Sequence, residues 1–173
     1  MKTIHNNFLN LAFNLAKINL GKTKNNPSVG CVVVKNGFVL SSGYTSMNGR
    51  PHAEFNTLNK KGNFSGSDLY VTMEPCIHYG LTPPCTNIIK KKKINRVFYS
   101  FNDVDKRSAK KSSLSLKENN IKVYKKENFF FKDFYQSYYI NRKKNLPLVD
   151  AKLALSKDYY TVNKKNKWIT NYH

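Results

Sequence analysis

An alternation of strand-like and helix-like segments constrains the fold of this chain most strongly. The run CVVVK (residues 31–35) is rich in β-branched residues and typical of a buried strand. Asn36 and Gly37 predict a two-residue hairpin turn into a return strand at residues 38–44. Further strands are predicted at residues 67–74, 94–101 and 121–125, and helices at residues 5–20, 51–61, 85–93, 112–120 and 128–144. This order predicts an α/β domain with a sheet covered on both faces.

The length and the cysteine content bound the class of protein. A chain of 173 residues is about one domain long, and three cysteines are too few for a secreted disulfide framework. The N-terminal segment is amphipathic and is not the apolar core of a signal peptide. No apolar run approaches the length of a membrane span. We therefore expect a cytoplasmic location, reduced thiols and no membrane partner.

The formal net charge of +20 comes almost entirely from lysine, since only Arg50, Arg96, Arg107 and Arg142 are arginines. A clustered basic surface would indicate nucleic-acid binding. However, the lysine runs at residues 90–93 and 110–111 have no interleaved aromatic residues, and lysine with abundant asparagine is typical of an AT-rich genome. We therefore do not expect nucleic acid as a partner, although the charge favours anionic substrates.

Two of the three cysteines lie nine positions apart in the stretch MEPCIHYGLTPPC (residues 73–85). A disulfide, a metal site and two unrelated thiols are all possible for Cys76 and Cys85. A catalytic zinc site needs three ligands, drawn from thiolates and imidazoles, and one open position for water. His52 opens a predicted helix and is followed two residues later by Glu54, which could move a proton without binding the metal.

The predicted helix starts support this interpretation. Thr82 is predicted to cap the helix at residues 85–93, which places Cys85 in the first turn, where a thiolate is stabilised. The order H-x-E followed by P-C is the signature of zinc nucleobase deaminases, although here the second cysteine comes nine positions after the first and not three. Taken singly, His52 could cap a helix, Glu54 could be surface charge and both cysteines could be ordinary thiols. Together they favour a zinc deaminase.

With these motifs the chain resembles the deaminase part of the bifunctional deaminase–reductase of riboflavin biosynthesis. The matching stretches are NPSVGCVVVKNG, the pair Gly43-Tyr44, GRPHAE and YVTMEPCIHYGLTPPC. The long loop between the two cysteines separates this family from tRNA adenosine deaminases and cytidine deaminases. The resemblance covers nearly the whole chain, because AKLALSKDYYT and KWIT look like the opening of the family's reductase domain.

The resemblance implies a three-layer α/β/α fold of the cytidine-deaminase type with a five-stranded mixed sheet. It implies hydrolytic deamination of a small-molecule pyrimidine ribotide, 2,5-diamino-6-ribosylamino-4(3H)-pyrimidinone 5′-phosphate, to 5-amino-6-(5-phosphoribosylamino)uracil and ammonia. By motif position, His52, Cys76 and Cys85 would hold one zinc ion and Glu54 would shuttle protons. The substrate would contact two residues, Asn26 in NPSVG and His78 in the cysteine loop.

Three departures from the family pattern concern the substrate. Leu81 stands where many members have a basic residue, and Thr45 stands where many have histidine. The stretch NDVDKRSAKKSS (residues 102–113) replaces a loop that is usually rich in proline and glycine. None of these changes involves the metal ligands or Glu54, so deamination is expected to survive them.

The resemblance also predicts the domain organisation. We expect a zinc-dependent deaminase domain at residues 1–146 and the truncated beginning of a reductase domain, opening like a new strand, at residues 147–173. No glycine-rich dinucleotide fingerprint is present, so NADPH is expected only if a complete reductase domain were present. Deaminases of this family associate through helices beside the active site, which predicts a homo-oligomer.

Two other functions are compatible with parts of the sequence. A non-catalytic, zinc-stabilised binding or assembly module fits Leu81 and the absent reductase, but such a module has no need of Glu54. A nucleic-acid adenosine or cytidine deaminase fits the net charge, but the wide cysteine spacing disfavours it.

Overall fold

A five-stranded mixed sheet forms the centre of the protein, as the sequence predicted. The computed structural model describes residues 2–109 and 111–162. The strands run in the order β2-β1-β3-β4-β5, with β1 antiparallel to β2 and β3, and β4 parallel to β3 and β5. Their bounds are β1 Gly30–Lys35, β2 Phe38–Tyr44, β3 Asp68–Met73, β4 Arg96–Phe101 and β5 Lys122–Lys125.

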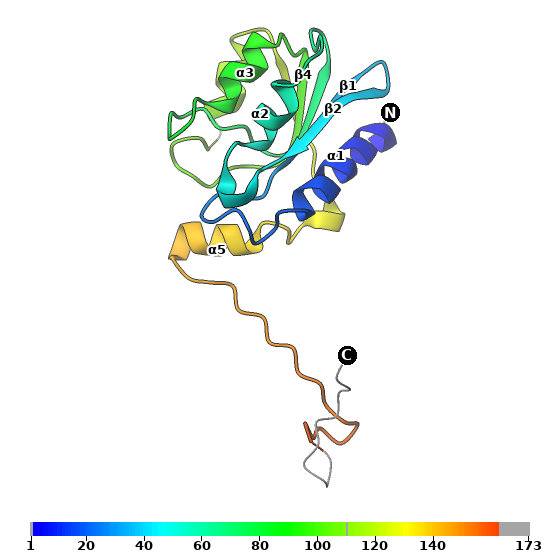
Figure 1. The fold of residues 1–173 in the computed structure, drawn as a ribbon, viewed down its shortest axis with the longest axis vertical. Helices are drawn as coiled ribbons and strands as arrows, with labels where there is room; N and C mark the ends of the chain where they lie inside the picture. Colours follow the sequence, from blue (N-terminus) through cyan, green and yellow to red (C-terminus); the bar gives the residue numbers. More distant parts are fainter. Residues whose placement is uncertain (1, 110, 163–173) are drawn as a thin grey trace.

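Helices cover both faces of this sheet (Figure 1). Their bounds are α1 Lys2–Lys17, α2 Ala53–Leu58, α3 Cys85–Lys91, α4 Lys111–Lys117 and α5 Gln136–Lys144, with short 3-10 turns at Met47–Gly49 and Phe129–Phe131. One face packs Val32 and Tyr70 of the sheet against Leu9 and Ala12 of α1. The opposite face packs on α2, α3 and α4, and the three-layer prediction is therefore confirmed.

The hairpin between β1 and β2 forms at the predicted turn. Asn36 and Gly37 both have positive φ angles, 51° and 82°, which is the backbone geometry that a tight two-residue hairpin requires. The alternation of side chains in β1 then places Cys31 and Val33 on one face and Val32 on the other. Because every one of these side chains is buried, β1 is an interior strand.

Two helix predictions were wrong in detail. The helix predicted from Pro51 begins at Ala53, and Thr82 does not cap α3, because Pro84 occupies that position with no side-chain capping bond. The Thr82 hydroxyl instead accepts a hydrogen bond from Arg50, at 2.9 Å.

The helix predicted at residues 128–144 is divided. A 3-10 turn at Phe129–Phe131 is capped by the side chain of Asn128, and α5 follows only from Gln136. The division turns Tyr135 into the core, where its hydroxyl contacts Thr72 Oγ1 at 2.6 Å and donates to the carbonyl of Ser28 at 3.0 Å.

Helix α5 ends at Lys144 and is capped by Asn145, whose left-handed backbone (φ 54°) stops the helix. The following residues are mostly exposed and run away from the sheet (Figure 1). The strand predicted at the start of this stretch does not form between residues 146 and 161. The KWIT segment lies outside the described residues. Among the described helices, none combines the length and apolarity that crossing a membrane would need.

Candidate functional site

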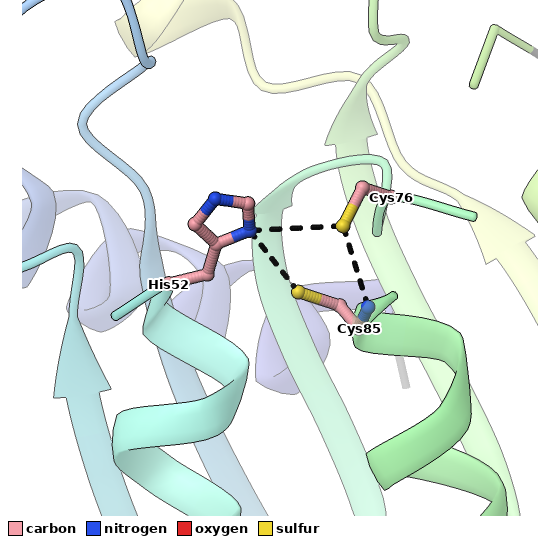
Figure 2. A group of neighbouring side chains, drawn as sticks. All are labelled: His52, Cys76 and Cys85. Carbon is pink, nitrogen blue, oxygen red and sulfur yellow. Dashed lines mark hydrogen bonds between the residues drawn. The ribbon is translucent and has the colours of Figure 1, made fainter. Parts of the chain in front are cut away.

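Three sequence-predicted metal ligands meet at one edge of the sheet (Figure 2). His52 directly precedes α2, Cys76 follows β3, and Cys85 is the first residue of α3. The Nδ1 atom of His52 lies 3.3 Å from Cys85 Sγ and 3.6 Å from Cys76 Sγ. The backbone N–H of Cys85 donates to Cys76 Sγ at 3.3 Å, and this hydrogen bond joins the two ends of the loop between the cysteines.

These distances fit a zinc ion. Zn–S bonds of about 2.3 Å and Zn–N bonds of about 2.0 Å in a tetrahedron place nitrogen and sulfur roughly 3.5 Å apart. The ligand atoms of the three residues all lie within 4.8 Å of one another, and both thiols are free of disulfides. Two sulfur donors and one nitrogen donor leave one tetrahedral position open, which is the arrangement of catalytic zinc sites.

The surroundings of Cys76 already favour the thiolate form. Hydrogen bonds from Cys85 and His52 lower the pKa of Cys76 well below its usual range, whereas the bond to Cys76 and burial raise the pKa of Cys85. The thiolate is the form of cysteine that binds metal. The third cysteine, Cys31, is buried in β1 and belongs to the core.

Glu54 is a buried residue of α2 and not a surface charge. Its side chain is only 4% exposed, and it lines the same pocket as His52 and Cys76. Burial raises the pKa of Glu54 to about 7, so that both the protonated and the ionised carboxyl are accessible near neutral pH. A group of this pKa can accept a proton and release it again at little cost. His52 sits at the N-cap position of α2 without a capping bond from its side chain, so the helix-cap interpretation of His52 is wrong.

A close approach of α2 to β2 positions His52 and Glu54. A Cβ atom at Gly43 would lie 2.7 Å from Thr57 Oγ1, so a larger residue in β2 would push the helix outward. The side chain of Asn56 donates to the carbonyl of Tyr44 at 2.8 Å and to Ser46 Oγ at 2.9 Å. These contacts fix the start of α2 against the end of the strand.

The structure brings the two predicted substrate residues to the pocket that His52, Cys76 and Glu54 line. The Asn26 amide donates to the carbonyl of Gly49 at 2.9 Å, and His78 Nδ1 lies 2.7 Å from Ser108 Oγ. Their contact with substrate stays a prediction. Leu81 is 88% exposed and does not line the pocket, whereas Thr45 lines it but is held by a hydrogen bond from the backbone N–H of Val29.

Sequence reasoning missed several polar residues of the pocket. They are Arg50, Glu74, Asp103, Asp105, Arg107, Tyr138 and Arg142. A usable signal was the parallel pairing of β3 with β4, because the carboxyl ends of parallel strands open at the same edge of a sheet. That pairing brings the loop after β4 beside the loop of Cys76. The sequence indicated Tyr138 and Arg142 less clearly, because the residues of an aromatic helix more often pack in a hydrophobic core than line a pocket.

Comparison with known proteins identifies the family. Residues 2–101 match the cytidine and deoxycytidylate deaminase zinc-binding region. The chain belongs to this deaminase family. It is 40% identical over 117 residues to a diaminohydroxyphosphoribosylamino-pyrimidine deaminase of Buchnera aphidicola, and covers 80% of that protein. It is also 38% identical over 152 residues to the riboflavin biosynthesis protein RibD of Chlamydia muridarum, a match covering 84% of this chain and 40% of that protein.

Solved structures of this deaminase family agree with the fold. The deaminase/reductase of Thermotoga maritima superposes with a TM-score of 0.87 at 30% identity, covering 98% of this chain and 50% of that one. RibD of Acinetobacter baumannii gives a TM-score of 0.85 at 32% identity, covering 98% of this chain and 49% of that one. The chain therefore spans about half the length of these two relatives.

Proposed function

We propose that this chain deaminates 2,5-diamino-6-ribosylamino-4(3H)-pyrimidinone 5′-phosphate hydrolytically, giving 5-amino-6-(5-phosphoribosylamino)uracil and ammonia. The observation that carries the proposal is a pocket lined by His52, Cys76 and the buried carboxyl of Glu54, with Cys85 completing the metal cluster. The named activity of the Buchnera relative supports the choice of substrate.

In this proposal each residue has a separate task. His52, Cys76 and Cys85 would hold zinc, which would supply a water of lowered pKa. The carboxyl group of Glu54 would accept a proton from the attacking water and later donate a proton to the amino group that leaves. One water is consumed and one ammonia is released, so no oxidant or reductant is needed.

The burial of Glu54 favours this enzyme over a binding module. Burying a carboxyl group is unfavourable, and a module that needs only its metal for stability has no use for one beside it. The wide spacing of Cys76 and Cys85 supports a ribotide substrate over a nucleic acid. Cytoplasmic location and association into homo-oligomers stay predictions.

The first prediction is ammonia release from the diaminopyrimidine ribotide by the zinc-loaded chain. We expect one ammonia for each uracil product, measured by a coupled ammonia assay and by mass spectrometry. Cytidine 5′-monophosphate and a single-stranded RNA serve as controls and should not be deaminated. A folded chain with one bound zinc that releases no ammonia from the ribotide contradicts the proposal.

We further propose that residues 1–146 are the deaminase domain and residues 147–173 the beginning of a reductase domain, with NADPH bound only by a complete reductase. The coverage of about half of each bifunctional relative supports this division. The buried hydrophobic core of the described chain lies wholly before residue 146.

The domain proposal predicts the effect of a truncation. A chain ending at Leu146 should keep its zinc content and far-UV circular dichroism, with a melting temperature within a few degrees of the full chain, because residues 149–162 are mostly exposed. Thermal unfolding of both chains at equal zinc concentration tests this. A chain ending at Lys132, which lacks the buried Tyr135 and α5, is the contrasting control and should be strongly destabilised. Aggregation or zinc loss in the chain ending at Leu146 would place the domain boundary further along the sequence.

A further inference from the structure

The few arginines of this lysine-rich chain gather at the candidate active-site pocket. Of the four arginines, Arg50, Arg107 and Arg142 line the pocket, and Arg96 is paired with Asp68 elsewhere. No lysine within residues 2–109 and 111–162 lines it, although lysines make up the rest of the 30 basic residues. Three of the four arginines of this lysine-rich chain therefore lie at one pocket.

Arg107 is held in a fixed orientation. Its Nε lies 2.9 Å from Asp105 Oδ1 and its Nη2 lies 2.5 Å from Asp105 Oδ2. The backbone N–H of Arg107 also donates to Asp105 Oδ1, at 3.0 Å. The Arg107 side chain is nevertheless 58% exposed, so the guanidinium can reach a ligand that enters the pocket from solvent.

Arg142 reaches the same pocket from α5. Its guanidinium lies over the ring of Tyr138, with 5.7 Å between its carbon and the ring centroid, and the Tyr138 hydroxyl donates to Asp103 Oδ1 at 3.0 Å. No ion pair joins Arg142 to a carboxylate in the described part of the chain. Its charge is therefore not neutralised by a direct partner.

Arg50 has a different role from the other two. Its Nη1 donates to Thr82 Oγ1 at 2.9 Å and lies 3.3 Å from His52 Nε2. These contacts tie Arg50 to the cysteine loop and to a metal ligand. Arg107 and Arg142 instead lie beyond residue 101, where the match to the zinc-binding region ends.

We infer that Arg107 and Arg142 bind the 5′-phosphate of the substrate, an inference that rests on the proposed ribotide deamination. The planar fork of arginine matches the oxygens of a phosphate, and charge-assisted hydrogen bonds of this kind are strong. Asp105 does not repel the phosphate, because Arg107 neutralises it and holds its pKa well below the usual range. The residues of the zinc-binding region thus perform the deamination, and Arg107 and Arg142, which follow that region in the sequence, select a phosphorylated substrate.

The test compares the ribotide with the same compound lacking its phosphate. Dissociation constants are measured by calorimetry in a zinc-loaded Glu54→Gln background, which prevents turnover, for Arg142→Ala, Arg107→Ala and Lys143→Ala. Lys143 is the matched control, because it is the next residue of α5, carries the same charge and lies 5.8 Å from the Tyr139 ring without lining the pocket. Circular dichroism and zinc content establish that each variant is folded.

We expect each arginine variant to bind the ribotide about 10- to 100-fold more weakly, with less than about a twofold change for the riboside. Lys143→Ala should leave both values unchanged. Unchanged ribotide binding in both arginine variants, or an equal loss for the riboside, overturns the inference. If the chain with Glu54 intact releases no ammonia but arginine-dependent binding persists, the reaction is wrong and the phosphate site stands. If ammonia is released but binding does not depend on the arginines, the reaction stands and the phosphate site is wrong.

Discussion

Replacing Glu54 by glutamine is expected to lower kcat for ammonia release by about 100- to 10,000-fold, the usual contribution of a general acid–base group. Glutamine has the same shape but cannot accept a proton, so it removes the proton transfer and keeps the packing. Zinc content should stay at one ion per chain, because the metal cluster consists of His52, Cys76 and Cys85. Steady-state kinetics and metal analysis of the same preparation test both expectations together.

A stability measurement provides the control for folding. In the zinc-free chain, burial raises the pKa of Glu54 to about 7 from an ordinary value near 4.5. The folded state therefore binds this proton more tightly than the unfolded state, and the contribution of Glu54 to stability falls as the pH rises from about 4.5 to 7. Glu54→Gln should lack this decline and be at least as stable as the parent at pH 7. A variant that keeps turnover within tenfold of the parent contradicts the role of Glu54, and one that unfolds contradicts the stability argument.

The sequence predicted the metal cluster because each of its residues has a local signature. His52 and Glu54 share one short motif, and Cys76 and Cys85 share one stiff loop, so few long-range contacts had to be known. The predicted helix starts then placed His52 and Cys85 each at the beginning of a helix. The residue types of the two motifs and the positions of the predicted helix starts therefore indicated the same metal site.

The phosphate end of the pocket had no such signature. Arg107 lies in an irregular loop, and Arg142 lies on α5, which begins only at Gln136 because the predicted helix at residues 128–144 is divided. At that division Tyr135 forms buried hydrogen bonds with Thr72 and Ser28, residues more than 60 positions away in sequence. Tertiary contacts of this range override helix periodicity and cannot be read from a local pattern.

Replacing Cys85 by serine is expected to remove the zinc ion and with it all measurable deamination. Serine keeps the size of the side chain but replaces a thiolate with a neutral hydroxyl, which is a poor zinc ligand. Because the ligands come from three separate segments, the metal also joins the start of α2 to the loop after β3 and to α3. Zinc at 1,000 times its Kd stabilises the folded chain by about 4 kcal/mol, a stabilisation that the variant should lack.

The measurement is the melting temperature with and without a strong chelator, together with zinc content. The parent chain should melt several degrees lower in chelator, whereas Cys85→Ser should melt at one temperature in both conditions. Cys31→Ala is the matched control, because Cys31 is buried in β1 outside the cluster. That variant should lose some stability through the cavity it creates but keep its zinc and its response to chelator. A Cys85→Ser chain that retains one zinc, or a Cys31→Ala chain that loses it, would show that the metal is held by a different set of residues. The separate responses of the two cysteines therefore distinguish a metal centre from a general sensitivity of buried thiols.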